Sequence, residues 1–217
     1  VGGVVVPAHQ CGNMSTDQYN TLSGESTGEV REKASRFLAY AFPVADEEAF
    51  KSRLAAVARE HHGARHICYA WIMGVVGDRF RAFDAGEPAG SAGRPILRQL
   101  QGAGLTQCAI IVVRYFGGTL LGKAGLAHAF ADAAKEALAH NGIVQCTVLA
   151  RMQVVCGYAM VEEVKKQVAQ AGGTVEQAAY TEQCTLTVAV PKSQADDLAA
   201  RWNAAGTTAQ VMPSPQA

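Results

Sequence analysis

Residues 108–130 read CAIIVVRYFGGTLLGKAGLAHAF, and they contain the strongest strand signal of the chain. The run from Cys108 to Val113 is apolar throughout, which is typical of a strand buried on both faces of a sheet. A glycine loop follows, and apolar residues at helical spacing then predict a helix over residues 124–140. β character resumes over residues 144–149, so the segment predicts a βαβ unit with a right-handed crossover.

The residues that precede this segment also alternate between strand and helix patterns. Residues 35–42 predict a strand that stops at Pro43. Residues 47–61 carry one apolar face of period 3.6, so they predict a helix capped by Asp46 and stopped by Gly63. This helix is expected to pack on a sheet.

A long glycine-rich stretch, residues 74–94, separates two further elements. Residues 65–73 before it alternate in the manner of a strand, and Pro95 after it opens a short helix. A connection of this length with little periodicity is usually functional or disordered in a compact domain. We therefore expect residues 74–94 to form a loop of one of these two kinds.

The last third of the chain repeats a more compact plan, with the element order βαββαβ of the ferredoxin-like split motif. The sequence thus predicts an α+β protein with an N-terminal domain of residues 19–145 and a ferredoxin-like domain of residues 146–213. Residues 1–18 are expected to be a disordered or extraneous leader, because Met14 to Asp17 has the character of a natural start. The elements of the last third are strands over residues 147–156, 174–180, 184–190 and 207–212, and helices over residues 159–171 and 192–204.

Composition excludes several classes of protein. The chain has 217 residues, 49% hydrophobic and 18% charged, which is the balance of a globular protein rather than a disordered one. Lysine and arginine number 19, as do aspartate and glutamate, so any RNA contact must be a local patch. The six cysteines include no CxxC pair, which indicates reduced core residues. With no apolar run of ~18 residues and no signal-peptide start, we expect a cytoplasmic protein without a membrane partner.

The segment from Gly117 to Ala124 matches the GxxxxGK pattern of a phosphate-binding loop. Ala124 stands where the pattern needs the hydroxyl that holds Mg²⁺, so a nucleotide triphosphatase loop is not expected. Two interpretations stay open. Glycine-freed amides at a helix start, beside Arg114 and Lys123, are able to hold an anion such as an RNA phosphate. Alternatively, the glycines only make a tight turn.

Two other groups of residues carry possible chemistry. His61, His62, His66 and Cys68 are potential zinc ligands, but a helix end and a strand separate them, so we expect surface or hydrogen-bonded histidines and no metal site.

Asp84 and Glu87 are a possible acid/base or metal pair, with His66 as a third catalytic group if the protein is an enzyme. The structural alternative is that the two acids cap turns or pair with Arg94 and Arg114. No nucleophile with an adjacent base is visible in the sequence.

Four ordered blocks resemble the signature blocks of the IMPACT/YigZ family. This resemblance implies an N-terminal βαβ-type domain like one in a ribosomal small-subunit protein and in elongation factor G, and a C-terminal domain like another domain of elongation factor G. It also implies a link to translation, because eukaryotic members are translation regulators. One departure is Ala85, which stands where the family usually has a second aspartate, and this fits a binding or structural loop better than a catalytic one. The blocks are KASRF (33–37), ARHICYA (64–70), GEPAGSAGRPIL (86–97) and VVRYFGG (112–118) with Leu121, Gly122, Gly125 and Leu126.

We therefore expect a translation-linked binding protein rather than an enzyme, with RNA, the ribosome or a translation-associated protein as partner and no cofactor. The alternatives are a hydrolase or transferase acting on a phosphorylated or peptide substrate in the same cleft, and a protein-interaction module that uses the C-terminal sheet. The predicted nucleic-acid or anion-binding face consists of Arg36, His66, Arg94, Arg114, Tyr115, Gly117, Gly118, Gly122 and Lys123.

Overall fold

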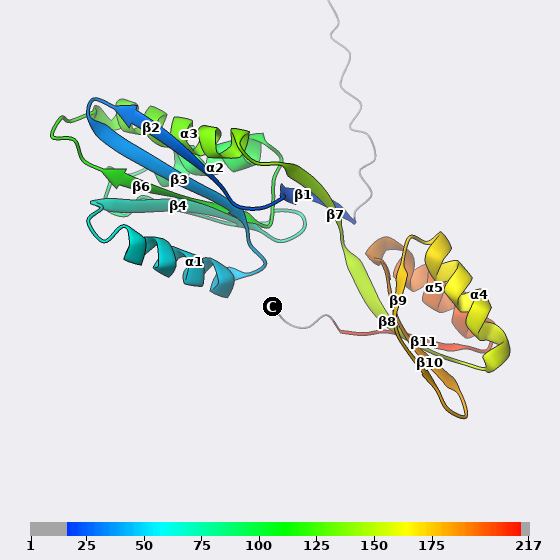
Figure 1. Cartoon of the computed structure of the whole chain (residues 1–217). Coiled ribbons are helices and arrows are strands. Elements are labelled where there is room, and N and C mark those ends of the chain that lie inside the picture. Colours follow the sequence, from blue (N-terminus) through cyan, green and yellow to red (C-terminus); the bar gives the residue numbers. More distant parts are fainter. Residues whose placement is uncertain (1–16, 214–217) are drawn as a thin grey trace, which may run out of the picture. The chain divides into compact units, whose positions relative to one another are not determined.

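The chain folds into two compact α+β units (Figure 1). The structure is a computed structural model, and it describes residues 17–213. The N-terminal unit consists of residues 19–146, and the C-terminal unit of residues from 147 onward together with Asp17 and Gln18. The predicted α+β class with two units is confirmed. The sequence predicts a disordered or extraneous leader over residues 1–18. Residues 1–16 lie outside the described residues, so the structure describes only Asp17 and Gln18 of this segment.

The N-terminal unit is built on a five-stranded sheet in the order β2-β3-β6-β4-β5. β6 lies at the centre, and β3 and β4 run antiparallel to it on either side. β3 and β4 are therefore parallel to each other, and α1 connects them in a split βαβ unit. The strands are β2 (Ser26–Glu32), β3 (Ser35–Pro43), β4 (His66–Met73), β5 (Arg79–Phe83) and β6 (Cys108–Tyr115), and the helix is α1 (Glu47–Glu60).

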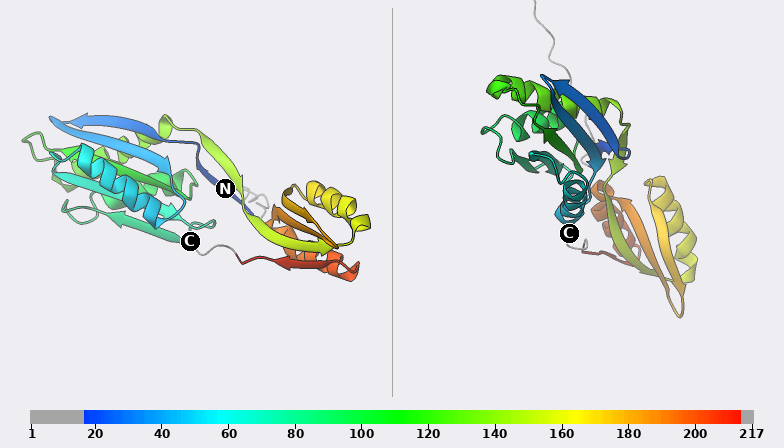
Figure 2. Two further views of the ribbon diagram at one scale, coloured as in Figure 1. Left: turned by 60° about the horizontal axis from the view of Figure 1, so that its bottom comes forward. Right: turned by 60° about the vertical axis from the view of Figure 1, so that its left-hand side comes forward.

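Helices cover both faces of this sheet. α1 packs on one face, and α2 (Gly93–Gly102) and α3 (Gly122–Ala139) pack on the other (Figure 1). Figure 2 shows α1 lying across the sheet in its left-hand view. Because β6 is central, Ile110 belongs to the core under α2 and α3, and Ile111 to the core under α1. The apolar run of β6 thus is buried on both faces, as predicted.

The α1 helix forms where the sequence predicts it. The Asp46 carboxylate caps it by accepting a hydrogen bond of 2.7 Å from the N–H of Ala49. Phe50 and Val57, seven residues apart on one helix face, are buried against the sheet.

Three predictions about the N-terminal unit are wrong. β7 (Ile143–Thr147) does not complete a βαβ unit with β6, because β3 and β4 already occupy both edges of β6; it pairs instead with β1 (Gln18–Leu22) in a separate two-stranded sheet. β2 lies in a stretch for which the sequence predicts no strand, and β5 lies inside the expected loop 74–94. Both are short edge strands: β2 buries only small residues, and all five residues of β5 are exposed, so neither has the apolar run of a central strand.

The C-terminal unit has the ferredoxin-like fold that the sequence predicts. Its sheet has the order β11-β8-β10-β9, and the three strand pairs are all antiparallel. α4 and α5 both pack on one face, where they cover a separate core (Figure 1). The elements are β8 (Leu149–Cys156), the short 3₁₀ helix η1 (Tyr158–Met160), α4 (Val161–Gln170), β9 (Thr174–Tyr180), β10 (Cys184–Pro191), α5 (Lys192–Ala204) and β11 (Thr208–Val211).

Asp17 belongs to the folded C-terminal unit although the sequence placed it in the leader. Its side chain is buried, and both carboxylate oxygens accept the N–H of Ser193 at 2.8 Å. Ser193 lies in the first turn of α5, whose N-cap residue Pro191 has no side chain that accepts a hydrogen bond. Asp17 therefore caps α5 from a distant part of the sequence.

Among residues 17–213, no helix is both long and apolar enough to span a membrane.

Candidate functional site

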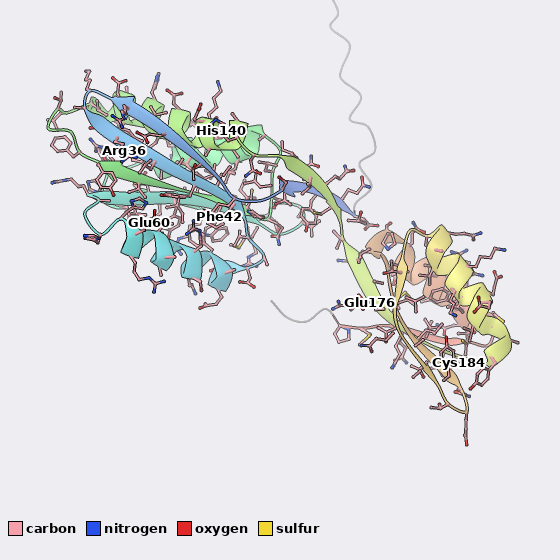
Figure 3. All side chains as sticks on the ribbon, viewed as in Figure 1. Arg36, Phe42, Glu60, His140, Glu176 and Cys184 are labelled. Atoms are coloured by element: carbon pink, nitrogen blue, oxygen red, sulfur yellow. The ribbon has the colours of Figure 1, made fainter. Side chains whose placement is uncertain are left out.

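Most of the predicted site residues meet at one end of the N-terminal sheet, which we call the loop end. It comprises Ser35 at the start of β3, His66 at the start of β4, Tyr115 at the end of β6, and the loops 84–92 and 116–121 that contact them. In the ladders, Arg36 lies opposite Tyr115, and His66 lies opposite Arg114. Figure 3 shows Arg36 near the loop end and Phe42 near the other end of β3.

A buried ion pair lies at the centre of the loop end. Nη1 of Arg114 donates to Oε1 and Oε2 of Glu87 at 2.6 and 2.8 Å, and the two side chains are only 6% and 2% exposed. The rings of Phe37 and Phe116 flank the guanidinium, with centroids 5.6 and 5.5 Å from Cζ. Nε of Arg114 has no hydrogen-bond partner within the described part of the chain. Arg114 therefore acts inside the protein and does not present a free charge on the surface.

Asp84 has a structural role in the same loop. Its carboxylate accepts three backbone N–H groups, those of Gly90, Ala92 and Gly93, at 2.8, 3.0 and 2.8 Å. Ala92 is the N-cap residue of α2 and has no side chain that accepts a hydrogen bond, so Asp84 supplies the cap. A Cβ at Gly93 would overlap the backbone of Phe83, which is why the helix begins with glycine directly against β5.

Asp84 should make the stability of the N-terminal unit depend on pH. Burial opposes its ionisation, but the three N–H donors outweigh this effect and hold the pKa of the carboxyl below its ordinary value. Because the pKa is lower in the folded chain, the ionised form stabilises the fold above about pH 4, the ordinary value, and this contribution disappears as pH falls through the folded pKa. Asp84→Asn should lower the free energy of unfolding at pH 7 by about 0.5–2 kcal/mol and flatten its decline below pH 4.

Urea unfolding between pH 2 and 7 in a Trp202→Phe background, followed by Trp71 fluorescence, measures this dependence. Asp132→Asn on the exposed face of α3 is the matched control, since it removes the same charge without removing a cap. An equal effect of the two substitutions on the pH profile would contradict the role of Asp84.

The candidate zinc ligands are engaged in hydrogen bonds or exposed. Nε2 and Nδ1 of His61 contact the hydroxyls of Tyr40 and Tyr115 at 2.6 and 2.8 Å. The carbonyl of Ala85 accepts from Nδ1 of His66 at 2.7 Å, so Nδ1 carries the hydrogen. Within residues 17–213, no three His, Cys, Asp or Glu side chains are grouped to hold a metal.

Cys68 and His66 both border the acidic loop. The Cys68 thiol donates to the carbonyl of Asp84 at 3.1 Å, and burial raises the pKa of that thiol well above its ordinary value. Nε2 of His66 lies 3.7 Å from Oε1 of Glu87. The structure thus brings His66 and Glu87 together, while the carboxylate of Asp84 is bound to the start of α2.

The glycines of the second loop have clear backbone functions. Gly118 and Gly122 adopt φ of +88° and +69°, a backbone conformation that residues other than glycine rarely adopt. Gly117 packs directly on the backbone of Ala34, where a Cβ would overlap. The α3 helix begins at Gly122 with no side-chain cap at Leu121, and Lys123 in its first turn is exposed.

Exposed cations surround the loop end, and two of them are absent from the sequence prediction. Lys33 lies in the β2–β3 turn, and Arg65 precedes β4. Together with the predicted Arg94 and Lys123, they form no ion pair with any described residue, whereas Arg36 is paired with Glu29 at 2.9 Å. Lys33 and Arg65 both lie inside the family blocks, at 33–37 and 64–70. Membership of these blocks was the sequence signal that could have identified them.

The fold and the loop end together define a two-domain α+β protein with a glycine-rich, cation-lined sheet end and a ferredoxin-like partner domain. The family model described as Impact N-terminal domain matches residues 33–138, and one described as a domain of unknown function (DUF1949) matches residues 154–201.

Known proteins agree with these matches. The chain is 34% identical over 171 residues to the IMPACT family member YigZ of Escherichia coli, which covers 78% of this chain and 84% of the relative. It is 28% identical over 164 residues to the IMPACT family member YvyE of Bacillus subtilis, 76% of each chain. A crystal structure of a hypothetical protein superposes with a TM-score of 0.66 at 28% identity, over 93% of this chain and 99% of that one. The chain belongs to the IMPACT family.

Proposed function

We propose that this IMPACT family protein is a non-enzymatic, translation-linked protein that binds RNA through the loop end of its N-terminal unit. One observation carries the proposal. The acidic side chains of the loop end have partners within the protein: Glu87 forms an ion pair with Arg114, and Asp84 accepts backbone N–H groups. The cations around them, in contrast, are exposed and unpaired within the described residues. The link to translation rests on the family, whose eukaryotic members are translation regulators.

The exposed cations come from four different segments of one sheet end. These side chains provide hydrogen-bond donors for the phosphate backbone of a nucleic acid, and binding to such a backbone results from several contacts of modest strength. The four cations are Lys33, Arg65, Arg94 and Lys123. The charge balance of the whole chain is zero, so the affinity must come from such a patch.

An aromatic ring lies beside these cations. Phe116 is 41% exposed and is available for stacking on an unpaired base. Tyr115, the other predicted stacking residue, is half-buried, and its hydroxyl contacts His61. We therefore assign the stacking role to Phe116 alone.

The test is binding of a labelled single-stranded RNA and of ribosomal subunits across a potassium chloride series. The variant Lys33→Ala/Arg65→Ala/Arg94→Ala/Lys123→Ala should reduce the slope of log K against log salt by about 0.7 per lost phosphate contact, and should weaken binding at low salt by on the order of 100-fold. Arg114 is kept, because its removal would leave Glu87 unpaired.

The matched control removes four exposed cations outside the loop end, in Lys135→Ala/Lys166→Ala/Lys192→Ala/Arg201→Ala. The proposal predicts near wild-type affinity for this control. Equal losses in both variants, or no binding by the wild type at low salt, would overturn it.

The alternative of a hydrolase or transferase is favoured by one observation, the contact of 3.7 Å between His66 and the buried Glu87. General acid–base catalysis by this pair requires the transfer of a proton to or from the two side chains. Both carboxylate oxygens of Glu87, however, accept hydrogen bonds from Nη1 of Arg114. We expect no turnover of p-nitrophenyl phosphate or of a peptide library above background. Turnover that His66→Gln abolishes would favour the enzyme instead.

A further inference from the structure

The two edges of the N-terminal sheet differ in a way that the RNA proposal does not use. The β2 edge is charged and internally paired: Glu29 binds Arg31 and Arg36, both at 2.9 Å. The β5 edge exposes all five of its residues, including Phe80 at 57% and Phe83 at 45%. Natural proteins protect edges with charges and avoid exposed apolar side chains there. The β5 edge has that protection only in part.

The register of β5 with β4 shows which side chains lie on each face. Phe80 lies opposite Ile72 on the side of α2, and Arg81 lies opposite Trp71 on the side of α1. Phe83 is on the same side as Arg81, where its ring contacts that of Tyr69 at 5.1 Å. A strand added at this edge would therefore contact an apolar side chain on each face of the sheet. A nucleic-acid base, which stacks from one side only, would contact just one of them.

The charges of β5 indicate the kind of strand that fits. Arg79 is already paired with Glu47 at 2.7 Å, whereas Arg81 forms no ion pair within the part of the chain that the structure describes. A second copy of β5 does not fit in the antiparallel register that overlaps all five residues, because pairing centred on Arg81 places two arginines opposite each other; pairing centred on Phe80 places Arg79 opposite Arg81. Like charges directly opposite destabilise a sheet. An acidic residue opposite Arg81 stabilises it.

We propose that β5 is a docking edge for an extended acidic segment of a protein partner, which adds to the sheet as a sixth strand. The backbone of the edge supplies hydrogen bonds, Phe80 contacts apolar residues of the segment on the side of α2, and Arg81 selects a carboxylate on the side of α1. This interaction is separate from RNA binding at the loop end, because it uses the open edge of the sheet and backbone pairing with a strand, although both ligands are anionic.

The probe is a fluorescein-labelled nine-residue peptide of alternating glutamate and valine, titrated with the full chain. We expect saturable binding, an affinity for a lysine–valine peptide at least tenfold lower, and a loss of about tenfold or more with Arg81→Glu. Arg98→Glu on the exposed face of α2 makes the same charge change off the edge and should leave binding unchanged. A peptide methylated on every backbone nitrogen should not bind, because neither of its edges can then pair as a strand.

Hydrogen exchange then locates the contact. The bound peptide should protect those amides of residues 79–83 that point away from β4, and leave those of β2 as they were. The proposal is overturned if the methylated peptide binds equally well, if Arg98→Glu weakens binding as much as Arg81→Glu, if single-stranded RNA protects residues 79–83 instead, or if these amides become protected by self-association without peptide.

Discussion

Replacing Arg114 by methionine is expected to lower the free energy of unfolding of the N-terminal unit by about 3–5 kcal/mol. The substitution leaves the Glu87 carboxylate, 2% exposed, without its cation, and an unpaired buried charge is far more costly than a lost surface ion pair. It also removes the guanidinium from between Phe37 and Phe116. This prediction distinguishes an internal Arg114 from one that binds RNA directly.

The measurement is urea unfolding in a Trp202→Phe background, where Trp71 alone reports on the N-terminal unit. The double variant Arg114→Met/Glu87→Leu should recover most of the lost stability, because it removes both charges together. Arg36→Met, which breaks the exposed pair with Glu29, is the control and should cost far less stability than Arg114→Met. A similar cost for Arg114→Met and Arg36→Met would contradict the role of the buried pair.

Trp202→Ala is expected to destabilise the C-terminal unit by about 3–5 kcal/mol. Trp202 is 1% exposed, and it fills the core between α4, α5 and the sheet with Leu198 and Val164. Its Nε1 also donates to Oε1 of Gln167 at 2.8 Å. The substitution therefore opens a cavity and leaves a polar group without its partner.

The two tryptophans of the chain make this test selective, because one lies in each unit. In Trp202→Ala, Trp71 reports on the N-terminal unit alone, and its unfolding midpoint should not change. Hydrogen exchange of the β8 and β10 amides should show the loss in the C-terminal unit. Trp202→Phe keeps most of the volume and should cost less. A matching shift of the Trp71 transition would mean that residues 19–146 and the rest unfold as one unit.

Local patterns predicted the buried and capped elements well. β6 was visible as an apolar run, and α1 as an apolar face that follows a capping aspartate, Asp46. β2 and β5 were missed because edge strands owe their structure to a neighbouring strand and not to their own apolar pattern. The position of β7 was wrong for a related reason: β6 has a pairing partner on each side, and only the assembled sheet shows this.

The site was predicted as a set of residues and not as a set of interactions. The sequence named Asp84, Glu87, His66 and Arg114, and it left open whether the acids act as catalysts or as caps and ion-pair partners. The structure decides this for each side chain: Glu87 binds Arg114, and Asp84 caps α2. Burial of Arg114 also moves the proposed RNA contacts to Lys33, Arg65, Arg94 and Lys123.

The sequence by itself determined the family, the two-unit α+β plan and the ferredoxin-like order of the last third, because short motifs and apolar periods depend on neighbouring residues. Only the tertiary structure decided which charges are internal and which edge strand is open. Arg114 and Glu87 become an ion pair because a loop and a central strand, distant in sequence, are packed together away from water, and a charge has a different role once water is excluded.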